Sequence, residues 1–302
     1  MIISGGTLST GRVERIPFGL AASNVEAYNR GSLELLDERL AEQHPAMEKG
    51  AVWIMHLFEF NDLAHIPASI RQTLLELMES CNRGFRSFNQ RAASEAMDQA
   101  KQKSCRTIVE LGAGVAPLTK LLAEDARQTG IRLVPCDLFP DVASYRALEQ
   151  SYPGVVKPLY SQVDYSRQHD FGPDALAALV GTFHHIPPKL RKQTLQAITK
   201  SAGRVMVFEP LRNTPISIFL VFFSIVPALL LPLFGMGSRG ALRRVLLCWL
   251  LPVVPCIFLW DGVVSCLRQW SPARWQRELR EIAGPTRPPT VTAGIHSLVV
   301  SW

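Results

Sequence analysis

Between residues 105 and 212, short apolar runs alternate with segments that repeat apolar positions at helical spacing. The short runs predict five strands, within 106–111, 131–139, 154–164, 174–186 and 204–211. The segments between them predict helices at 116–130, 141–152 and 187–202. Strands that alternate with helices form βαβ units. The pattern therefore predicts an α/β fold with a doubly wound, mainly parallel sheet, whose ligands bind beyond the carboxyl ends of the strands.

The preceding part of the chain, residues 1–104, predicts a helical N-terminal cap. Leucine recurs at helical spacing within 32–43. An aromatic-rich segment begins at residue 53 and continues as an amphipathic helix that is capped near Ser69. A further polar helix is expected over 86–103.

Two long apolar runs follow the last predicted parallel strand and define an insert over 213–262. Residues 216–234 form a run of nineteen residues without a charge, and 245–260 add sixteen more. A helix needs about 20 apolar residues to cross a bilayer, so the first run barely suffices and the second falls short. Residues 263–302 then predict a helix and strands that complete the core.

The connection between the two apolar runs carries Arg239, Arg243 and Arg244. If both runs crossed a membrane, these arginines would emerge on the side opposite the α/β domain, which is expected in the cytosol, against the positive-inside rule. A kinked hairpin that enters one leaflet avoids this conflict, because its arginines can return to the lipid headgroups. One alternative is that the insert is a lid that forms the wall of an apolar substrate tunnel. Another is that it forms a homodimer interface.

Composition limits the classes of ligand and the cellular location that the sequence allows. The net charge of +6 is spread along 302 residues, so no nucleic-acid-binding stripe is expected. The six cysteines form no C-x-x-C pair, which favours reduced, buried thiols and a cytosolic-side location. Residues 1–15 lack the apolar core of a signal peptide.

A glycine turn joins the first predicted strand to its helix. Gly112 and Gly114 allow positive φ and a close approach of a ligand, and Pro117 suits the first helical turn, whose amides favour an anion. A dinucleotide fingerprint would need a small residue at 117, which weighs against NAD. Glu110 precedes the glycines and can receive an ammonium group. The turn therefore suits S-adenosylmethionine (SAM), which carries an amino group and a carboxylate.

The segment "VELGAG" at 109–114 resembles the first motif of class I SAM-dependent methyltransferases, and residues 105–212 follow the strand order of that family. Segments 58–71 and 260–272 also resemble a bacterial subgroup with a hydrophobic insert. The resemblance implies a Rossmann-like, seven-stranded-type sheet, SAM as the cofactor and methyl transfer as the reaction.

The resemblance also implies roles for further cofactor residues. Asp137 would hold the ribose hydroxyls, with Asp141 as the competing residue. Asp164 would meet the adenine amine, unless it is a solvated loop acid. Leu138 and Thr182 are further candidates for cofactor binding.

The predicted fourth strand ends in a histidine pair, His184 and His185. Methyl transfer depends on holding the acceptor in line with the methyl group, and a hydroxyl or acidic carbon also needs a base. Because successive strand residues alternate, one histidine is expected to face the cleft while the other points away. The alternative is that both are structural. Glu209, which ends the fifth strand, would line the acceptor site or pair with Arg212.

Other charged groups receive weaker predictions. Glu59, Asp62 and His65 form a lid over the cofactor or are surface charges of the cap. Asp261 and Arg268 are expected to make a local salt bridge. No metal is expected, because no His, Asp or Glu group shows ligand spacing within one helix or loop.

These observations predict a methyltransferase on the cytoplasmic side of a membrane, monotopic or peripheral. Its acceptor would be an apolar small molecule or lipid, methylated at oxygen or carbon. One alternative is a soluble methyltransferase whose insert is a substrate lid. The other is a catalytically inactive, membrane-bound interaction protein.

Overall fold

The structure is a computed structural model that describes residues 59–302, except 61–62, 64–65, 85, 235–239, 285–287 and 295–296. All described residues belong to one compact unit, Val52–Trp302. Some sequence predictions therefore fall outside the described residues: those for 32–43, Asp62, His65 and Arg239.

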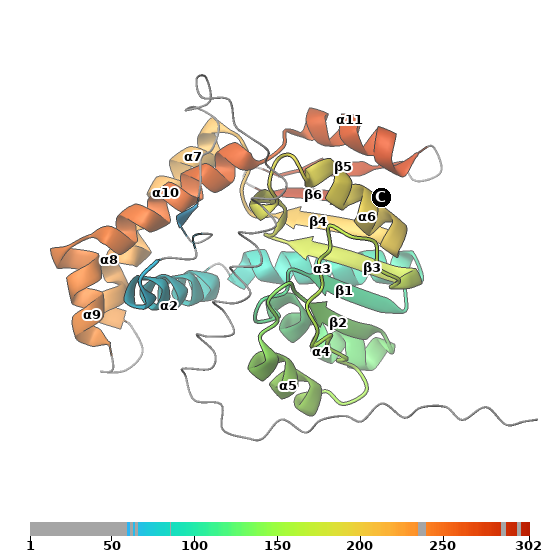
Figure 1. Cartoon of the computed structure of the whole chain (residues 1–302), viewed down its shortest axis with the longest axis horizontal. Coiled ribbons are helices and arrows are strands. Elements are labelled where there is room, and N and C mark those ends of the chain that lie inside the picture. Colours follow the sequence, from blue (N-terminus) through green and yellow to red (C-terminus); the bar gives the residue numbers. More distant parts are fainter. Residues whose placement is uncertain are drawn as a thin grey trace, which may run out of the picture. The chain divides into compact units, whose positions relative to one another are not determined.

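The described residues form one six-stranded sheet in the order β2-β1-β3-β4-β6-β5 (Figure 1). Its strands are β1 (Thr107–Leu111), β2 (Arg132–Cys136), β3 (Gly172–Val180), β4 (Ala202–Glu209), β5 (Thr290–Ala293) and β6 (Leu298–Ser301). Strands β1 to β4 pair in parallel, while β6 runs antiparallel between β4 and β5. This arrangement confirms the predicted doubly wound, Rossmann-like sheet.

Helices cover both faces of the sheet. They are α3 (Arg86–Gln102), α4 (Pro117–Thr129), α5 (Val142–Ser151), α6 (Arg191–Ser201) and α11 (Pro272–Ala283). Ile108 packs with residues of α3, α4 and α5, whereas its neighbour Val109 packs with residues of α6 and α11. Side chains of successive strand residues point to opposite faces, so burial on both sides explains the continuous apolar runs of the strands.

The strand predicted within 154–164 is reduced to a single parallel bridge, Leu133 to Val156. The Leu159 N–H also donates to the Pro135 carbonyl, at 3.1 Å. Pro158 lies between these contacts and has no N–H to donate to a ladder, which explains why a regular strand does not form. The segment still runs along β2, in the place of a seventh strand.

The insert is helical. It contains α7 (Pro215–Phe222), α8 (Ile225–Phe234), α9 (Ala241–Val245), the π-helical turn η3 (Leu246–Leu250) and α10 (Val253–Arg268). Helix α10 continues without a break beyond the predicted boundary at residue 262, and it contacts η2 (Phe183–His185), the turn that follows β3.

Helix α2 (Ala68–Gly84) belongs with the insert, although the sequence grouped it with α3 in one cap. It contacts α8, α9 and α10. The apolar cluster that joins them contains Leu74, Leu77, Ala228, Leu231, Cys248, Val254 and Ile257. Helix α3 instead packs on the sheet through Ala92, Ala96 and Met97.

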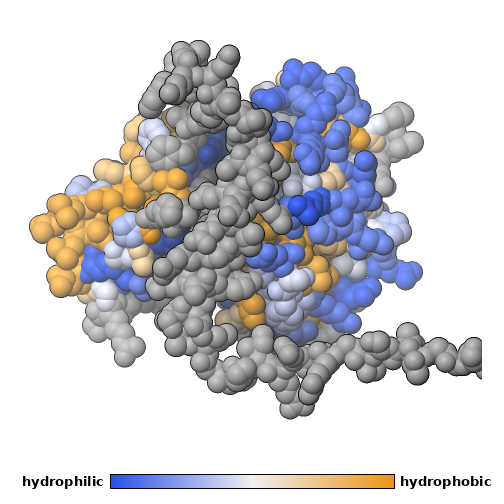
Figure 2. Space-filling model, viewed as in Figure 1, coloured by the Kyte–Doolittle hydropathy of each residue, from blue (hydrophilic) through white to orange (hydrophobic). Residues whose placement is uncertain are grey.

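The outer surface of the insert is apolar. Figure 2 shows hydrophobic residues gathered over these helices, while the sheet core presents a mostly hydrophilic surface. Phe219, Phe223, Leu233, Leu250 and Leu251 are each more than half exposed. The segment Pro215–Leu233, which contains α7 and most of α8, has the length and hydropathy to cross a membrane. Ala241–Leu250 with Val253–Arg268 form a pair bent by 67° that passes the same test together.

The two described arginines of the insert bind α2. Nη2 of Arg243 lies 2.6 Å from Oε1 of Glu76, and Nη1 of Arg244 lies 3.4 Å from Oε2 of the same carboxylate. Arg244 is buried. The prediction that Arg244 returns to the lipid headgroups is therefore wrong, because its side chain is buried and lies against Glu76 inside the protein.

Candidate active site

The predicted site residues gather at the carboxyl ends of β1 to β4. The strand order reverses between β1 and β3, and open α/β sheets bind ligands at such a switch point. The two strand ends touch there, since a Cβ atom on Gly112 would lie 2.5 Å from Cγ2 of Thr182. Only glycine fits at position 112, which also has a φ of +67°.

The glycine turn after β1 is open on one side. Gly114 has a φ of +51°, and a Cβ atom there would meet no heavy atom within 4 Å. Ala116, which precedes α4, also has a left-handed backbone, and its side chain offers no cap to the helix. The turn therefore leaves space beside Gly114, and the N-terminus of α4 needs a cap from a residue outside the turn.

Glu110 supplies that cap. Its carboxylate is buried and accepts hydrogen bonds from the N–H groups of Leu118, at 3.1 Å, and Thr119, at 2.8 Å. Burial raises the pKa of Glu110 to about 7, although these hydrogen bonds act to lower that pKa. The expectation that the first amides of α4 await an anionic ligand is wrong for these two amides, because Glu110 already binds them. Contact between Glu110 and a ligand stays a prediction.

Asp137 joins the end of β2 to the same turn. Its Oδ2 accepts from the Gly114 N–H at 2.7 Å, and its Oδ1 accepts from the Phe139 N–H at 2.7 Å. Leu138, between them, is half-buried. The competing acid, Asp141, is the N-cap of α5. Asp137 is thus the acid that lies against the glycine turn.

Asp164 follows the segment that runs along β2. The Val163 N–H donates to the Asp137 carbonyl at 2.9 Å, which brings Asp164 near the end of that strand. The Asp164 carboxylate accepts from the N–H and hydroxyl of Ser166 and lies 3.2 Å from Nε of Arg167. It is therefore held within its own loop, and its contact with adenine stays a prediction.

The two histidines lie on a 3-10 turn, η2 (Phe183–His185), and not on a strand. Gly181, with a φ of +63°, ends β3 before them. The predicted alternation is wrong, because the rings of His184 and His185 lie against each other with centroids 4.1 Å apart. Buried Arg191 holds this turn by donating to the carbonyls of His184 and Ile186.

Glu209 orients His184. Nδ1 of His184 lies 2.8 Å from Oε2 of Glu209, which is fully buried at the end of β4. Burial raises the pKa of Glu209, but His184, Gln269 and the Phe183 N–H together outweigh burial and leave that pKa below its usual value. Arg212, the alternative partner, donates instead to the Gly294 carbonyl.

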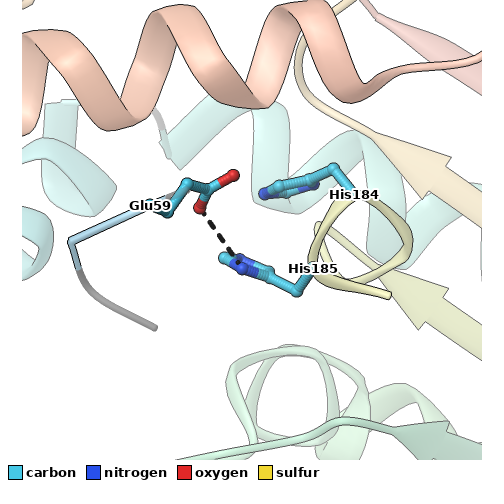
Figure 3. Close-up of side chains that lie close together, drawn as sticks. All are labelled: Glu59, His184 and His185. Atoms are coloured by element: carbon cyan, nitrogen blue, oxygen red, sulfur yellow. Dashed lines mark ion pairs between the residues drawn. The ribbon is translucent and has the colours of Figure 1, made fainter. Parts of the chain in front are cut away.

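Glu59 completes this cluster from outside the sheet (Figure 3). Its buried carboxylate lies 3.3 Å from Nδ1 of His185 and 3.2 Å from both Nη1 of Arg268 and the Ser265 hydroxyl, which are on α10. The alternative that Glu59 is a surface charge is therefore wrong. Asp261, also on α10, accepts from the Phe60 N–H at 2.7 Å.

One potential ligand atom each from Glu59, His184 and His185 lies within 4.8 Å of the others. Sequence reasoning missed this group because the carboxylate and the histidines are more than 100 residues apart in the chain. The expectation of no metal considered spacing within single helices and loops, so it did not address such a group. The apolar context of Glu59 in "LFEF" was the available signal that it is buried.

No family model and no curated protein matches the sequence. Among solved structures, the plantazolicin methyltransferase BpumL in complex with SAH is 7% identical, covers 77% of this chain and 93% of its own, and has a TM-score of 0.47. Human N-acetylserotonin methyltransferase in complex with SAM is 13% identical, with coverages of 77% and 56% and a TM-score of 0.45. The methyltransferase domain of bacterial CtHen1 is 9% identical, with coverages of 71% and 98% and a TM-score of 0.44.

The chain has the class I methyltransferase fold. This follows from its own sheet, with β6 antiparallel between β4 and β5, independently of these superpositions. The glycine turn and the histidine cluster lie at one edge of that fold, at the ends of neighbouring strands.

Proposed function

We propose that this protein transfers the methyl group of SAM to an apolar acceptor, and that its insert docks on the cytoplasmic side of a membrane. The observation that carries the proposal is the charge of the glycine turn. Glu110 and Asp137 both bind backbone N–H groups of the turn and of α4. This edge therefore combines open space beside Gly114 with two acids.

That charge selects between ligand classes. A dinucleotide presents a pyrophosphate, which Asp137 would repel, and Glu110 as well once it is ionised above its pKa of about 7. SAM presents an ammonium and a sulfonium, which they attract. The geometry thus favours the cationic nucleoside through the acids themselves, in addition to the missing third glycine of a dinucleotide fingerprint.

The same residues fit the parts of SAM. The space beside Gly114 suits the amino-acid tail, Asp137 suits the ribose hydroxyls, and Leu138 with Asp164 suits the adenine. Thr182 packs below the turn against Gly112. When bound, SAM supplies a methyl group on a positively charged sulfur, so no further activation of the donor is needed.

The histidine cluster is the proposed acceptor side. Glu209 holds His184 in one orientation, whereas the His185 side chain is 40% exposed and can meet an acceptor. The cluster would receive the proton of a hydroxyl or acidic carbon. As the acceptor bonds to the methyl carbon, the carbon–sulfur bond breaks and its electron pair stays on sulfur, which gives S-adenosylhomocysteine.

The exposed apolar face of the insert supports the membrane part of the proposal. A folded monomer rarely exposes a large contiguous apolar patch unless another phase or partner covers it. Helix α10 leads from this face to the cluster, since Ser265 and Arg268 on its last turns contact Glu59. An acceptor drawn from a bilayer would thus enter next to the residues that we propose act on it.

The test is to incubate the full chain with methyl-labelled SAM and a cell lipid extract, followed by mass spectrometry. The expected result is label in an apolar product, and its loss in the His185→Ala variant. Label only in polar molecules or in protein would overturn the apolar acceptor. No label transfer, together with no SAM binding in calorimetry, would favour the inactive interaction protein.

A further inference from the structure

The cluster of Glu59, His184 and His185 has a composition that its proposed role in proton transfer does not require. We propose that these three residues form a binding site for a divalent transition metal ion of the zinc class. The inference rests on the proposed function only in placing the ion beside the acceptor. Binding of the metal ion itself depends only on the ligand atoms of these three residues.

The donor set decides the class of metal. Two imidazoles and one carboxylate suit Zn²⁺ and its neighbours, whereas Mg²⁺ and Ca²⁺ prefer oxygen ligands. The three donor atoms lie within 4.8 Å of one another, close enough to share one ion after small adjustments. Zinc sites with three protein ligands keep a fourth position open for water or substrate, as in sites with two histidines and a glutamate. The exposed side of His185 gives access to that position.

The surroundings of the donors resemble the outer shell of a metal site. A histidine that binds a metal usually donates its other ring N–H to a carboxylate, which fixes its tautomer. Glu209 occupies Nδ1 of His184 in this way and leaves Nε2 for the ion. Ser265 and Arg268 donate to Oε1 of Glu59, while Oε2 faces Nδ1 of His185.

The charges around the cluster set the expected affinity. Glu59 and Glu209 are buried acids, and the guanidiniums of Arg268 and Arg191 lie nearby. Without an ion, these four charges balance. A dication therefore adds net positive charge, and we expect weaker binding than at a structural zinc site with thiolate ligands. Such an ion would lower the pKa of a hydroxyl placed at its open position, as zinc lowers that of bound water.

The experiment uses the purified full chain after treatment with a chelator. Co²⁺ and then Zn²⁺ are titrated while visible absorption and heat are recorded. The wild type is expected to bind one ion per chain, with the absorption of Co²⁺ in a low-symmetry site. His185→Ala and Glu59→Gln change a direct ligand and should each weaken binding at least about 100-fold, and Glu209→Gln, which removes the charge of an outer-shell partner, about 10-fold to 100-fold.

His169→Ala is the matched control, because His169 lies outside the cluster and bonds the Asp164 carbonyl. It should bind the ion like the wild type. Near-ultraviolet circular dichroism checks that each variant is folded. No binding by the wild type, or equal binding by all variants, would overturn the proposal. SAM affinity of the metal-free protein is measured in parallel: SAM binding without metal binding refutes only the metal site, whereas loss of SAM binding refutes the proposed function.

Discussion

The sheet core and the insert are both rich in apolar residues, yet they use them differently. Every residue of β1 is buried, and the helices on both faces of the sheet supply the partners. In Pro215–Leu233, only 22% of the most apolar window is buried inside the protein. Folding therefore buries the apolar residues of the core and leaves most of those of the insert exposed. The proposed docking of the insert on a membrane would account for this difference.

Ion pairs hold the insert at both of its ends. Glu76 on α2 binds Arg243 and Arg244 within the group of helices that α2 forms with the insert, and Glu59 binds Arg268 where α10 reaches the histidines. The Glu59–Arg268 pair thus attaches the end of α10 to the histidine cluster. The core and the insert can be perturbed separately, and the largest effect is expected in the core.

The first prediction concerns the core. Gly114→Asp should lower the affinity for SAM more than about 100-fold, because the new side chain would fill the space beside Gly114 that the amino-acid tail needs, and its carboxylate would repel the carboxylate of that tail. Calorimetric titration with SAM measures the change.

Gly130→Asp is the control for this variant. Gly130 also has a positive φ, +72°, with no heavy atom within 4 Å of its Cβ position, but it lies at the other end of α4. It should leave SAM affinity unchanged. Equal affinities for the two variants would refute the role of the glycine turn.

The second prediction concerns the pH dependence of stability. The folded Glu110 carboxyl holds its proton up to a pKa of about 7, while the unfolded one loses it near 4.5. Its contribution to the free energy of unfolding is thus fully present below pH 4.5 and is lost as pH rises through 7, by about 3 kcal/mol. Glu110→Gln should remove this loss, as measured by urea unfolding from pH 4 to pH 8.

Glu124→Gln is the matched control, because Glu124 lies on the exposed side of α4 and pairs with Arg127. It should keep the decline in stability with rising pH that the wild type shows. A wild type and a Glu110→Gln variant with parallel pH profiles would show that Glu110 is not held protonated by burial.

The third prediction concerns the insert. The rings of Phe219, Phe222 and Phe223 are each more than half exposed. Partial burial of three such rings in lipid contributes roughly 2 kcal/mol, given about 1.5–3 kcal/mol for full burial of one. The triple serine variant should therefore bind anionic lipid vesicles roughly 30-fold more weakly in a flotation assay, with unchanged SAM affinity.

The control replaces three exposed apolar residues of the core, Leu121, Val142 and Tyr160, with serine. These residues should not affect flotation. A wild type that stays with the soluble fraction would instead favour the lid. A wild type that forms a dimer in light scattering, dissociated by the phenylalanine variant, would favour the homodimer interface.

The smallest expected effect is at the junction of α2 and the insert. Arg243→Gln should destabilise α9 by about 1 kcal/mol, because its ion pair with Glu76 is only 20% and 30% exposed. Hydrogen exchange of α9 amides measures the change. The Arg127–Glu124 pair on α4 has the same 2.6 Å distance, but its side chains are 62% and 49% exposed. Arg127→Gln should therefore cause no measurable change in the hydrogen exchange of α4 amides. Equal exchange in both variants would refute the structural role of the junction.

The sequence predicted the parts of this protein that local patterns encode. The five-residue apolar run of β1, the two glycines and the amphipathic α4 are each visible within a short window. The missing strand was also visible in principle, since Pro158 interrupts it. The lack of a polar residue at Ala116 likewise signalled that α4 needs a cap from elsewhere, which Glu110 provides.

The histidine cluster could not be predicted in the same way. Its assembly depends on how Glu59 and α10 meet η2, and such contacts follow from tertiary packing that spacing does not record. Burial of Arg244 against Glu76 has the same origin. Local patterns thus predicted the glycine turn and Asp137, whereas the histidine cluster required the three-dimensional structure.

The central claim is that the glycine turn and Asp137 hold the amino-acid tail and ribose of SAM. A crystal structure of the chain soaked with S-adenosylhomocysteine tests it most directly. We expect density for the tail beside Gly114 and for the ribose beside Asp137. Density elsewhere, or none at a saturating concentration, would contradict it.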